Sequence, residues 1–241
     1  MNYILVIPAR YKSTRFPGKP LVKIKGKTLL QRVYEQCLKA VDSDKIFVAT
    51  DDYQIQQHCI STDMKCVLTS EECLTGTDRV AEVSKKINAD YYINVQGDEP
   101  VFNPKDITLL LDKIKKSKIK YDVYGGYCPL KNSKEYNSPH VPKVIFNLNN
   151  ELLYMSRSPI PGNKNFFFNY GYRQVCAYGF SKKSLEIIIN NKEKTPIEDE
   201  EDIELLRFLE LGLKVKMIEM SDMSIPVDNP EDIQKVLNAI T

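Results

Sequence analysis

The sequence predicts an α/β fold, built on a mostly parallel sheet with helices on both faces. Short apolar runs bounded by turn residues, such as 3–7 and 45–51, are typical of buried strands. Stretches with apolar residues at helical spacing, such as 29–40, lie between these runs. Only a few residues connect strand to helix, and this alternation favours parallel strands joined by crossover helices.

The same patterns place the remaining elements in order along the chain. A second helix is expected over 53–60, and a third begins near Asp78 behind a capping threonine. The stretch 104–116 is amphipathic and predicts another helix. Further strands are expected over 66–68, 91–95, 122–127 and 214–220, and further helices over 197–211 and after 233.

Residues 132–178 break this alternation. Short strands are expected at 144–146, 152–154 and 175–178, with turn residues between them. We interpret the segment as an antiparallel insertion within a single domain of residues 1–241. No internal repeat, low-complexity tract or linker divides the sequence.

Composition argues against several classes of protein. With 42% hydrophobic and 27% charged residues, the 241-residue chain is typical of a soluble globular protein. No apolar run is long enough to span a bilayer, and the chain enters a strand without a signal peptide, so we expect a cytoplasmic location. Six scattered cysteines and two histidines argue against a zinc site. The net charge of +2 argues against a dedicated nucleic-acid binder.

The loop at residues 8–20 concentrates positive charge behind the first strand. No acidic residue precedes Glu35, and the first 34 residues carry a net charge of +8, whereas the whole chain carries +2. Open α/β sheets bind ligands at the carboxyl ends of their strands. One interpretation is a solvated basic loop. We favour a polyphosphate site, because three prolines and Gly18 stiffen the backbone that carries the cations.

Two aspartates are candidate ligands of a hard cation. Asp98 follows the predicted strand 91–95 in the sequence Q-G-D-E-P, and Asp228 lies in V-D-N-P near the C-terminus. Mg²⁺ is typically held by one or two carboxylates plus substrate phosphates. The alternative is that each aspartate only caps the helix that follows it, near Pro104 and Pro230 respectively.

Six motifs run in order along nearly the whole chain. They read I-P-A-R-Y-K-S-T-R-F-P-G-K-P from 7, T-G-T-D-R from 75, Q-G-D-E-P from 96, S-R-S-P-I-P from 156, P-I-E from 196 and V-D-N-P-E-D from 227. Together they resemble the motifs of the CMP-Kdo synthetases, the 3-deoxy-manno-octulosonate cytidylyltransferases among the sugar nucleotidyltransferases. The resemblance implies a Rossmann-like nucleotidyltransferase core with a mixed, mostly parallel sheet. The antiparallel insertion at about 132–178 is then expected to form the wall of the site on the acceptor side and to support a homodimer.

The resemblance also implies roles for individual residues. It implies catalytic roles for Lys19, Arg15 and Asp98. It implies Mg²⁺ as the cofactor, held by Asp98 and Asp228. It implies contacts to CTP for Arg10, Ser13, Gly76, Thr77 and Gln96. It implies contacts to the sugar acid for Arg157, Gln174 and Glu198. An arginine fork suits a carboxylate, so Arg157 is the candidate anchor of the acid group.

The implied activity is transfer of CMP from CTP to Kdo, or to a related 2-keto-3-deoxy sugar acid, with release of pyrophosphate, in lipopolysaccharide biosynthesis. Such catalysis depends chiefly on positioning and charge stabilisation. Two alternatives stay open. A nucleotide-sugar-dependent glycosyltransferase of similar fold does not need the basic loop, and a non-catalytic nucleotide-binding protein does not need the pair of aspartates. No nucleic-acid or membrane partner is expected.

The chain departs from the family pattern on the acceptor side. Gln174 stands where the family has the histidine of H-x-G-I-Y-G, and Pro226 and Asn229 replace a glycine and a threonine. A glutamine amide offers both a donor and an acceptor. We therefore expect the nucleotide half to keep cytidine chemistry and the acceptor pocket to be altered, toward a Kdo derivative or a related acid sugar.

Overall fold

The computed structural model describes residues 1–12, 16–165 and 167–240. The described strands are β1 Tyr3–Pro8, β2 Lys23–Ile24, β3 Lys27–Thr28, β4 Ile46–Thr50, β5 Cys66–Leu68, β6 Tyr91–Val95, β7 Val123–Pro129, β8 Lys143–Phe146, β9 Leu152–Ser156, β10 Tyr172–Ser181 and β11 Val215–Glu219. The described helices are α1 Leu29–Leu38, α2 Tyr53–Ser61, α3 Gly76–Lys86, α4 Pro104–Lys116, α5 Ser133–Asn137, α6 Lys182–Asn190, α7 Pro196–Glu201, α8 Leu205–Glu210 and α9 Asp232–Ala239, with short 3-10 turns η1 Lys19–Leu21 and η2 Ser43–Lys45.

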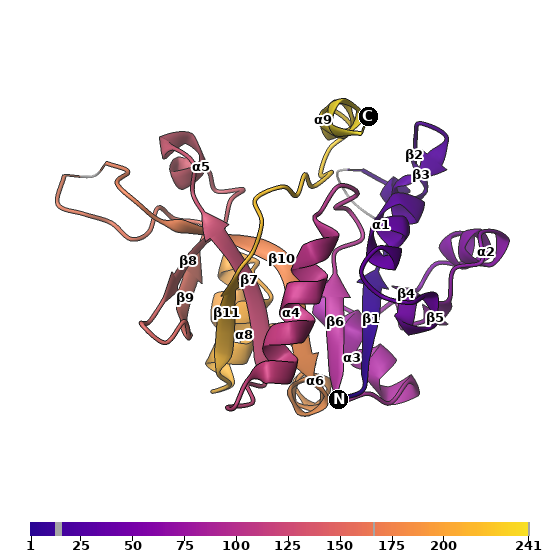
Figure 1. Cartoon of the computed structure of the whole chain (residues 1–241), viewed down its shortest axis with the longest axis horizontal. Helices are drawn as coiled ribbons and strands as arrows, with labels where there is room; N and C mark the ends of the chain where they lie inside the picture. The colour runs from indigo at the N-terminus through magenta and orange to yellow at the C-terminus, as the bar shows by residue number, and fades with distance from the viewer. Residues whose placement is uncertain (13–15, 166, 241) are drawn as a thin grey trace.

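The main sheet has the strand order β11-β7-β10-β6-β1-β4-β5 (Figure 1). Strands β6, β1, β4 and β5 are parallel to one another, and β11 is parallel to β7. Strand β10 lies between β6 and β7 and is antiparallel to both. The predicted fold class, a mixed and mostly parallel sheet in an α/β protein, is confirmed.

Helices cover both faces of the sheet, each with its own hydrophobic core. One core contains the buried apolar faces of α1 and α4, and α4 lies in front of the sheet in Figure 1. The other contains the buried faces of α3, α6 and α8. Each helix has one apolar side because its hydrophobic residues recur at helical spacing. Among the helices in the described ranges, none is long and apolar enough to cross a membrane.

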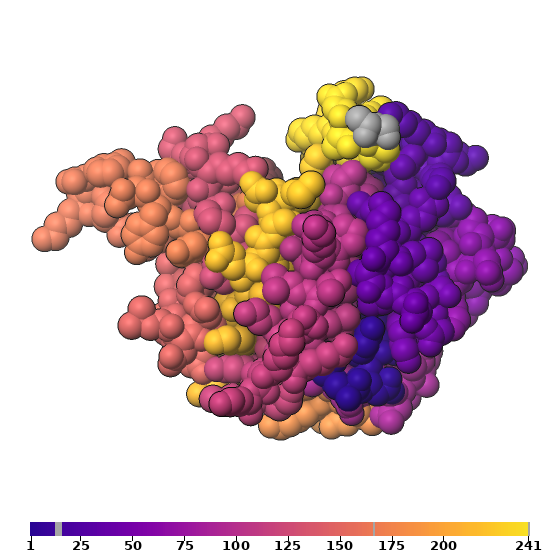
Figure 2. Space-filling model, viewed as in Figure 1, coloured from indigo at the N-terminus to yellow at the C-terminus, as the bar shows by residue number. Residues whose placement is uncertain are grey.

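The antiparallel segment differs in detail from the insertion expected at 132–178. Strands β8 and β9 form a hairpin beside β10, as the pattern indicated. However, β10 continues to Ser181 and pairs with β6 and β7 inside the main sheet, so residue 178 lies within a central strand. The described part of the loop between β9 and β10 stands out from the body of the molecule (Figure 2). The segment is therefore partly a peripheral arm and partly the centre of the sheet.

The single helix predicted over 197–211 is two helices, α7 and α8. Asp202 ends α7 in the left-handed conformation, with φ of 48°. Aspartate tolerates this conformation better than most residues, and a single such residue breaks a helix. The break turns the chain, so the acidic residues on either side of it face different neighbours.

Candidate active site

A cavity of about 550 Å³ opens at the carboxyl ends of β1 and β6. Its walls come from the loop after β1, the start of α3, the loop after β6, the turn between α7 and α8, and the segment before α9. It is lined by seven residues that the sequence singled out: Arg10, Lys19, Gly76, Gln96, Asp98, Glu198 and Asp228. Segments far apart in the sequence therefore meet where parallel α/β sheets usually bind ligands. Ser13 and Arg15 lie outside the described residues.

Lys19 joins the two segments that carry the candidate metal ligands. Its Nζ donates to Asp98 Oδ2 at 2.7 Å and to the carbonyl of Val227 at 2.7 Å. The backbone N–H of Val227 in turn donates to the carbonyl of Asp98 at 2.9 Å. Gly18, with φ of 69°, precedes η1 and turns the chain into it, so that Lys19 enters the cavity. Asp98 and the residue before Asp228 are thus held together by three hydrogen bonds.

The loop after β6 passes very close to the end of β1. A Cβ added at Gly97 would lie 2.5 Å from the carbonyl oxygen of Pro8, which is a steric clash. Only glycine therefore allows this approach, and it sets the position of Asp98 at the cavity wall.

Neither aspartate occupies the N-cap position of a helix. Asn103 caps α4, where its side chain accepts from the N–H of Lys105 at 3.1 Å. Glu231, and not Asp228, is at the N-cap position of α9. The alternative interpretation, that both aspartates are helix caps, is therefore wrong.

The donor set of the cavity fits Mg²⁺ bound together with a nucleotide. Asp98 and Asp228 both line it and offer the carboxylate oxygens that Mg²⁺ prefers. Within the described part of the chain, no three His, Cys, Asp or Glu side chains are grouped to hold a metal by themselves. Two carboxylates that need phosphate oxygens to complete the shell match the way Mg²⁺ usually binds in nucleotide enzymes.

The N-terminus of α3 holds a carboxylate of the chain itself. Glu204 Oε2 accepts from the N–H of Thr77 at 2.8 Å and from its hydroxyl, and Glu204 Oε1 accepts from the N–H of Gly76 at 3.2 Å. A carboxylate is stabilised there by the helix dipole. The donors of Gly76 and Thr77 that the sequence assigned to CTP are therefore bound to Glu204, and only Gly76 lines the cavity.

Glu204 is a cavity residue that sequence reasoning missed. It follows an acidic run, 198–202, whose charges all suit the first turns of a helix. No feature of the sequence therefore distinguishes Glu204 from its acidic neighbours as a cavity residue. The break at Asp202 is what directs Glu204 to α3.

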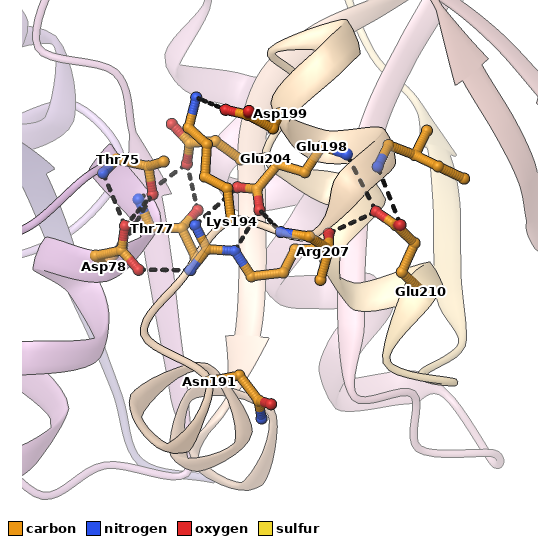
Figure 3. Close-up of polar contacts among 12 residues, drawn as sticks. Thr75, Thr77, Asp78, Asn191, Lys194, Glu198, Asp199, Glu204, Arg207 and Glu210 are labelled. Carbon is orange, nitrogen blue, oxygen red and sulfur yellow. Dashed lines mark hydrogen bonds and ion pairs between the residues drawn. The ribbon is translucent and has the colours of Figure 1, made fainter.

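A buried ion-pair network joins α3 to α7 and α8 (Figure 3). The Arg207 guanidinium binds Glu198 through two nitrogens, one at 2.8 Å, and binds Asp78 Oδ1 at 2.6 Å. Burial would lower the pKa of Arg207, but the hydrogen bonds to Glu198 and Asp78 raise it overall. For Glu198, burial outweighs the bond from Arg207 and raises the pKa of the carboxyl.

This network determines which groups the carboxylate of Glu198 contacts. Only 1% of its side chain is exposed, and its carboxylate is engaged by Arg207 and by the N–H of Thr195. The structure therefore gives Glu198 a structural partner, and its contact with the sugar acid stays a prediction.

Arg157 and Gln174, the other predicted acceptor contacts, do not line the cavity. The Arg157 guanidinium donates to the backbone carbonyls of Pro139 at 2.9 Å and Asp202 at 3.0 Å, and also to that of Glu201. It thus supports the turn between α7 and α8. The buried Gln174 donates from Nε2 to the hydroxyl oxygen of Tyr178.

Together, the mixed sheet and a cavity that gathers Arg10, Lys19, Asp98 and Asp228 define an α/β enzyme of the nucleotidyltransferase class. Residues 4–218 match the family described as Cytidylyltransferase, and the chain belongs to this family.

Proteins similar to this chain match it over almost its whole length. The 3-deoxy-manno-octulosonate cytidylyltransferase of Protochlamydia amoebophila is 41% identical, over 96% of this chain and 91% of that protein. The protein of the same name from Escherichia coli is 35% identical, over 97% of this chain and 94% of that protein. The solved structure of CMP:2-keto-3-deoxy-manno-octonic acid synthetase with CTP has a TM-score of 0.91 and 33% identity, and the match covers 100% of this chain and 98% of that chain. The resemblance seen in the motifs is confirmed.

Proposed function

We propose that this protein transfers CMP from CTP to Kdo, or to a closely related 2-keto-3-deoxy sugar acid, and releases pyrophosphate. The observation that carries the proposal is the meeting of Lys19, Asp98 and Asp228 in one cavity, from three distant parts of the chain. The names of the similar proteins, and the CTP in one similar structure, support the same substrates. The product would supply activated Kdo for lipopolysaccharide biosynthesis.

In the proposed reaction, the anomeric hydroxyl of the sugar acid attacks the α-phosphorus of CTP. A new oxygen–phosphorus bond forms as the bond to pyrophosphate breaks, and the hydroxyl proton is lost to solvent. Arg10 and Lys19 bind the triphosphate and offset the charge that builds on the leaving group. Arg15 and Ser13 belong to the same proposal by their place in the motif. No covalent protein nucleophile is required.

The proposed cofactor is Mg²⁺, which Asp98 and Asp228 would hold. When bound, Mg²⁺ supplies Lewis-acid polarisation of phosphate oxygens and charge neutralisation. The chain itself holds the segments of Asp98 and Asp228 close together, because Lys19 and the backbone hydrogen bond between Val227 and Asp98 join them. Gln96 lines the same cavity and is the proposed contact to the nucleotide.

The proposed acceptor contacts are Arg157, Gln174 and Glu198. Arg157 follows β9, and its guanidinium donates to the carbonyl of Asp202 in the turn between α7 and α8. This turn lines the cavity through Asp202 and Ile203. For its guanidinium to bind the acid group of the sugar, it must exchange backbone carbonyls for a carboxylate, which is the stronger acceptor. Acceptor binding is therefore expected to move this turn.

The assembly and location are also part of the proposal. The β9 residues Leu153 and Tyr154, and Phe167 and Tyr170 on the projecting arm, are exposed apolar or aromatic side chains. Such side chains suit a contact between subunits. We therefore propose a homodimer formed through this side, acting in the cytoplasm.

The decisive experiment measures pyrophosphate release from CTP and Mg²⁺ with and without Kdo. Release that depends on Kdo supports the proposal, and Asp98→Asn is the control in which the rate at a given Mg²⁺ concentration should fall. A glycosyltransferase would consume a nucleotide sugar without releasing pyrophosphate. A binding protein would bind CTP and release nothing. Either result rejects the proposed function.

A further inference from the structure

The contacts of Lys19 bear on how a metal ion can enter the site. Lys19 Nζ lies 2.7 Å from Asp98 Oδ2 and 2.7 Å from the Val227 carbonyl, between the segments that carry the two aspartates. Its side chain is only 15% exposed and that of Asp98 only 29%, so solvent screens this ion pair less than a surface pair. Within the chain, the charge of Asp98 is therefore neutralised by an internal cation, Lys19.

We infer that Lys19 is the counter-ion of Asp98 in the free protein and keeps the site from binding a divalent cation until a nucleotide engages the lysine. The inference rests on the proposed metal site and adds an order of binding to it. It assigns Lys19 a role separate from its contact with the triphosphate during reaction.

The physical reason is repulsion between like charges at short range. A Mg²⁺ or Mn²⁺ ion bound to Asp98 would sit about 2 Å from a carboxylate oxygen. The ammonium is on the same carboxylate, so the two cations would lie within a few ångströms of each other. At that distance, unit charges in a partly buried site interact by several times the thermal energy. The metal must therefore displace Lys19 from Asp98 or bind weakly beside it.

A triphosphate relieves this competition. An ammonium has three donors, and among the described residues Lys19 directs two of them to Asp98 and to the Val227 carbonyl. Phosphate oxygens offer Lys19 a more strongly charged partner and give the metal its missing ligands. Metal and nucleotide then bind with positive coupling, and by linkage each strengthens the other by the same factor.

Lys12 provides a matched control. It lines the same cavity, but its Nζ pairs with Glu71 Oε2 at 3.0 Å, and both side chains are largely exposed. Lys12→Met therefore removes the same charge from the cavity without touching Asp98.

The test is a titration of the free protein with Mn²⁺, followed by the electron paramagnetic resonance signal of the unbound ion. We expect Lys19→Met to bind Mn²⁺ about tenfold more tightly than the wild type without nucleotide, and Lys12→Met to change affinity less than about twofold. Adding Asp98→Asn to Lys19→Met should abolish the gain. With CTP present, and relative to CTP and Mn²⁺ without protein, the wild type should gain more Mn²⁺ affinity than Lys19→Met does.

Lys19→Gln is the second variant, because it keeps a donor for the Val227 carbonyl and preserves the fold if Lys19→Met does not. Unchanged Mn²⁺ affinity in the Lys19 variants overturns the inference, and so does an equal gain in Lys12→Met. No Mn²⁺ binding by the wild type even with CTP removes the metal site and the inference together. Failure of Kdo-dependent pyrophosphate release rejects the proposed function and leaves the Mn²⁺ result standing.

Discussion

Arg207 on α8 and Asp78 on α3 form an ion pair of 2.6 Å that connects two helices on the same face of the sheet. Arg207 also holds Glu198, and both members of that second pair are 1% exposed. The start of α3 and the turn after α7 both line the cavity, so the network fixes the two walls relative to each other.

Removal of the Arg207 charge is therefore expected to destabilise the fold strongly. Arg207→Met leaves the buried carboxylate of Glu198 without its partner, and breaking a buried pair in this way typically costs about 3–5 kcal/mol. Urea unfolding, monitored by circular dichroism, measures the change. The double variant with Glu198→Met should recover part of the loss, because the buried carboxylate of Glu198 is then no longer left without its charged partner. Equal loss in the double variant would contradict this explanation.

Gly97 is expected to tolerate no side chain. In Gly97→Ala, the Cβ would meet the Pro8 carbonyl at 2.5 Å, so the loop that carries Asp98 must shift. We expect a loss of about 1–3 kcal/mol in the free energy of unfolding and a clear fall in kcat.

Gly162→Ala is the matched control for Gly97→Ala. Apart from its two chain neighbours, no atom of the described residues lies within 4 Å of a Cβ placed at Gly162, and this glycine has no positive φ. Stability and kcat should therefore stay close to the wild-type values. If Gly97→Ala behaves like this control, the close approach to Pro8 does not position Asp98.

The two aspartates are expected to act on one ion. Asp98→Asn and Asp228→Asn each remove one charge from the proposed Mg²⁺ site, so their effects on kcat should be strongly non-additive. Both single variants should need more Mg²⁺ for half-maximal rate. The measurement is a Mg²⁺ titration of pyrophosphate release for the wild type, both single variants and the double variant. Full rate at limiting Mg²⁺ in either single variant excludes that residue as a ligand.

Stability at acid pH should depend on Glu201. Its carboxylate accepts from the N–H of Arg157 at 2.7 Å and from the hydroxyl of Ser156 at 2.6 Å. Burial would raise the pKa of Glu201, but these hydrogen bonds and that from Tyr154 lower it below its ordinary value of 4.5. A lowered pKa gives stability that is present above the unfolded value and is lost as the pH falls through the folded one.

We therefore expect Glu201→Gln to be less stable than the wild type at about pH 7 and to lose less stability on acidification to about pH 3.5. Urea midpoints at several pH values, compared between the two proteins, isolate the contribution of Glu201. Parallel pH curves for the two proteins would show that Glu201 has the same pKa in the folded and unfolded states.

The sequence predicted the sheet and most helices because each element carries its own hydrophobic period and its own turn signals. It also predicted that residues following different strands share one site, since parallel strands end at one edge of a sheet. The partners of the buried charges could not be predicted in this way. Glu198 and Arg207 meet only because Asp202 breaks the helix between them, and no pattern in the acidic run marks that break. The same break directs Glu204 to Gly76 and Thr77.

The preference for one sugar acid over another is expected to depend on Gln174. Gln174 stands where the related family has a histidine, and here its Nε2 donates to the Tyr178 hydroxyl, with both side chains buried. A sugar hydroxyl or amine that enters this region must match the remaining donor and acceptor of the amide. A mismatch leaves a buried polar group unpaired, at a cost of about 1–3 kcal/mol, which changes preference about tenfold or more.

We expect the wild type to show a higher kcat/KM for an amino-substituted Kdo or another 2-keto-3-deoxy acid than for Kdo. Gln174→His should move that preference toward Kdo. The measurement is kcat/KM for each acid in both proteins, with Tyr178→Phe to remove the present partner of Gln174. A preference for unmodified Kdo that does not change in Gln174→His would exclude an altered acceptor pocket.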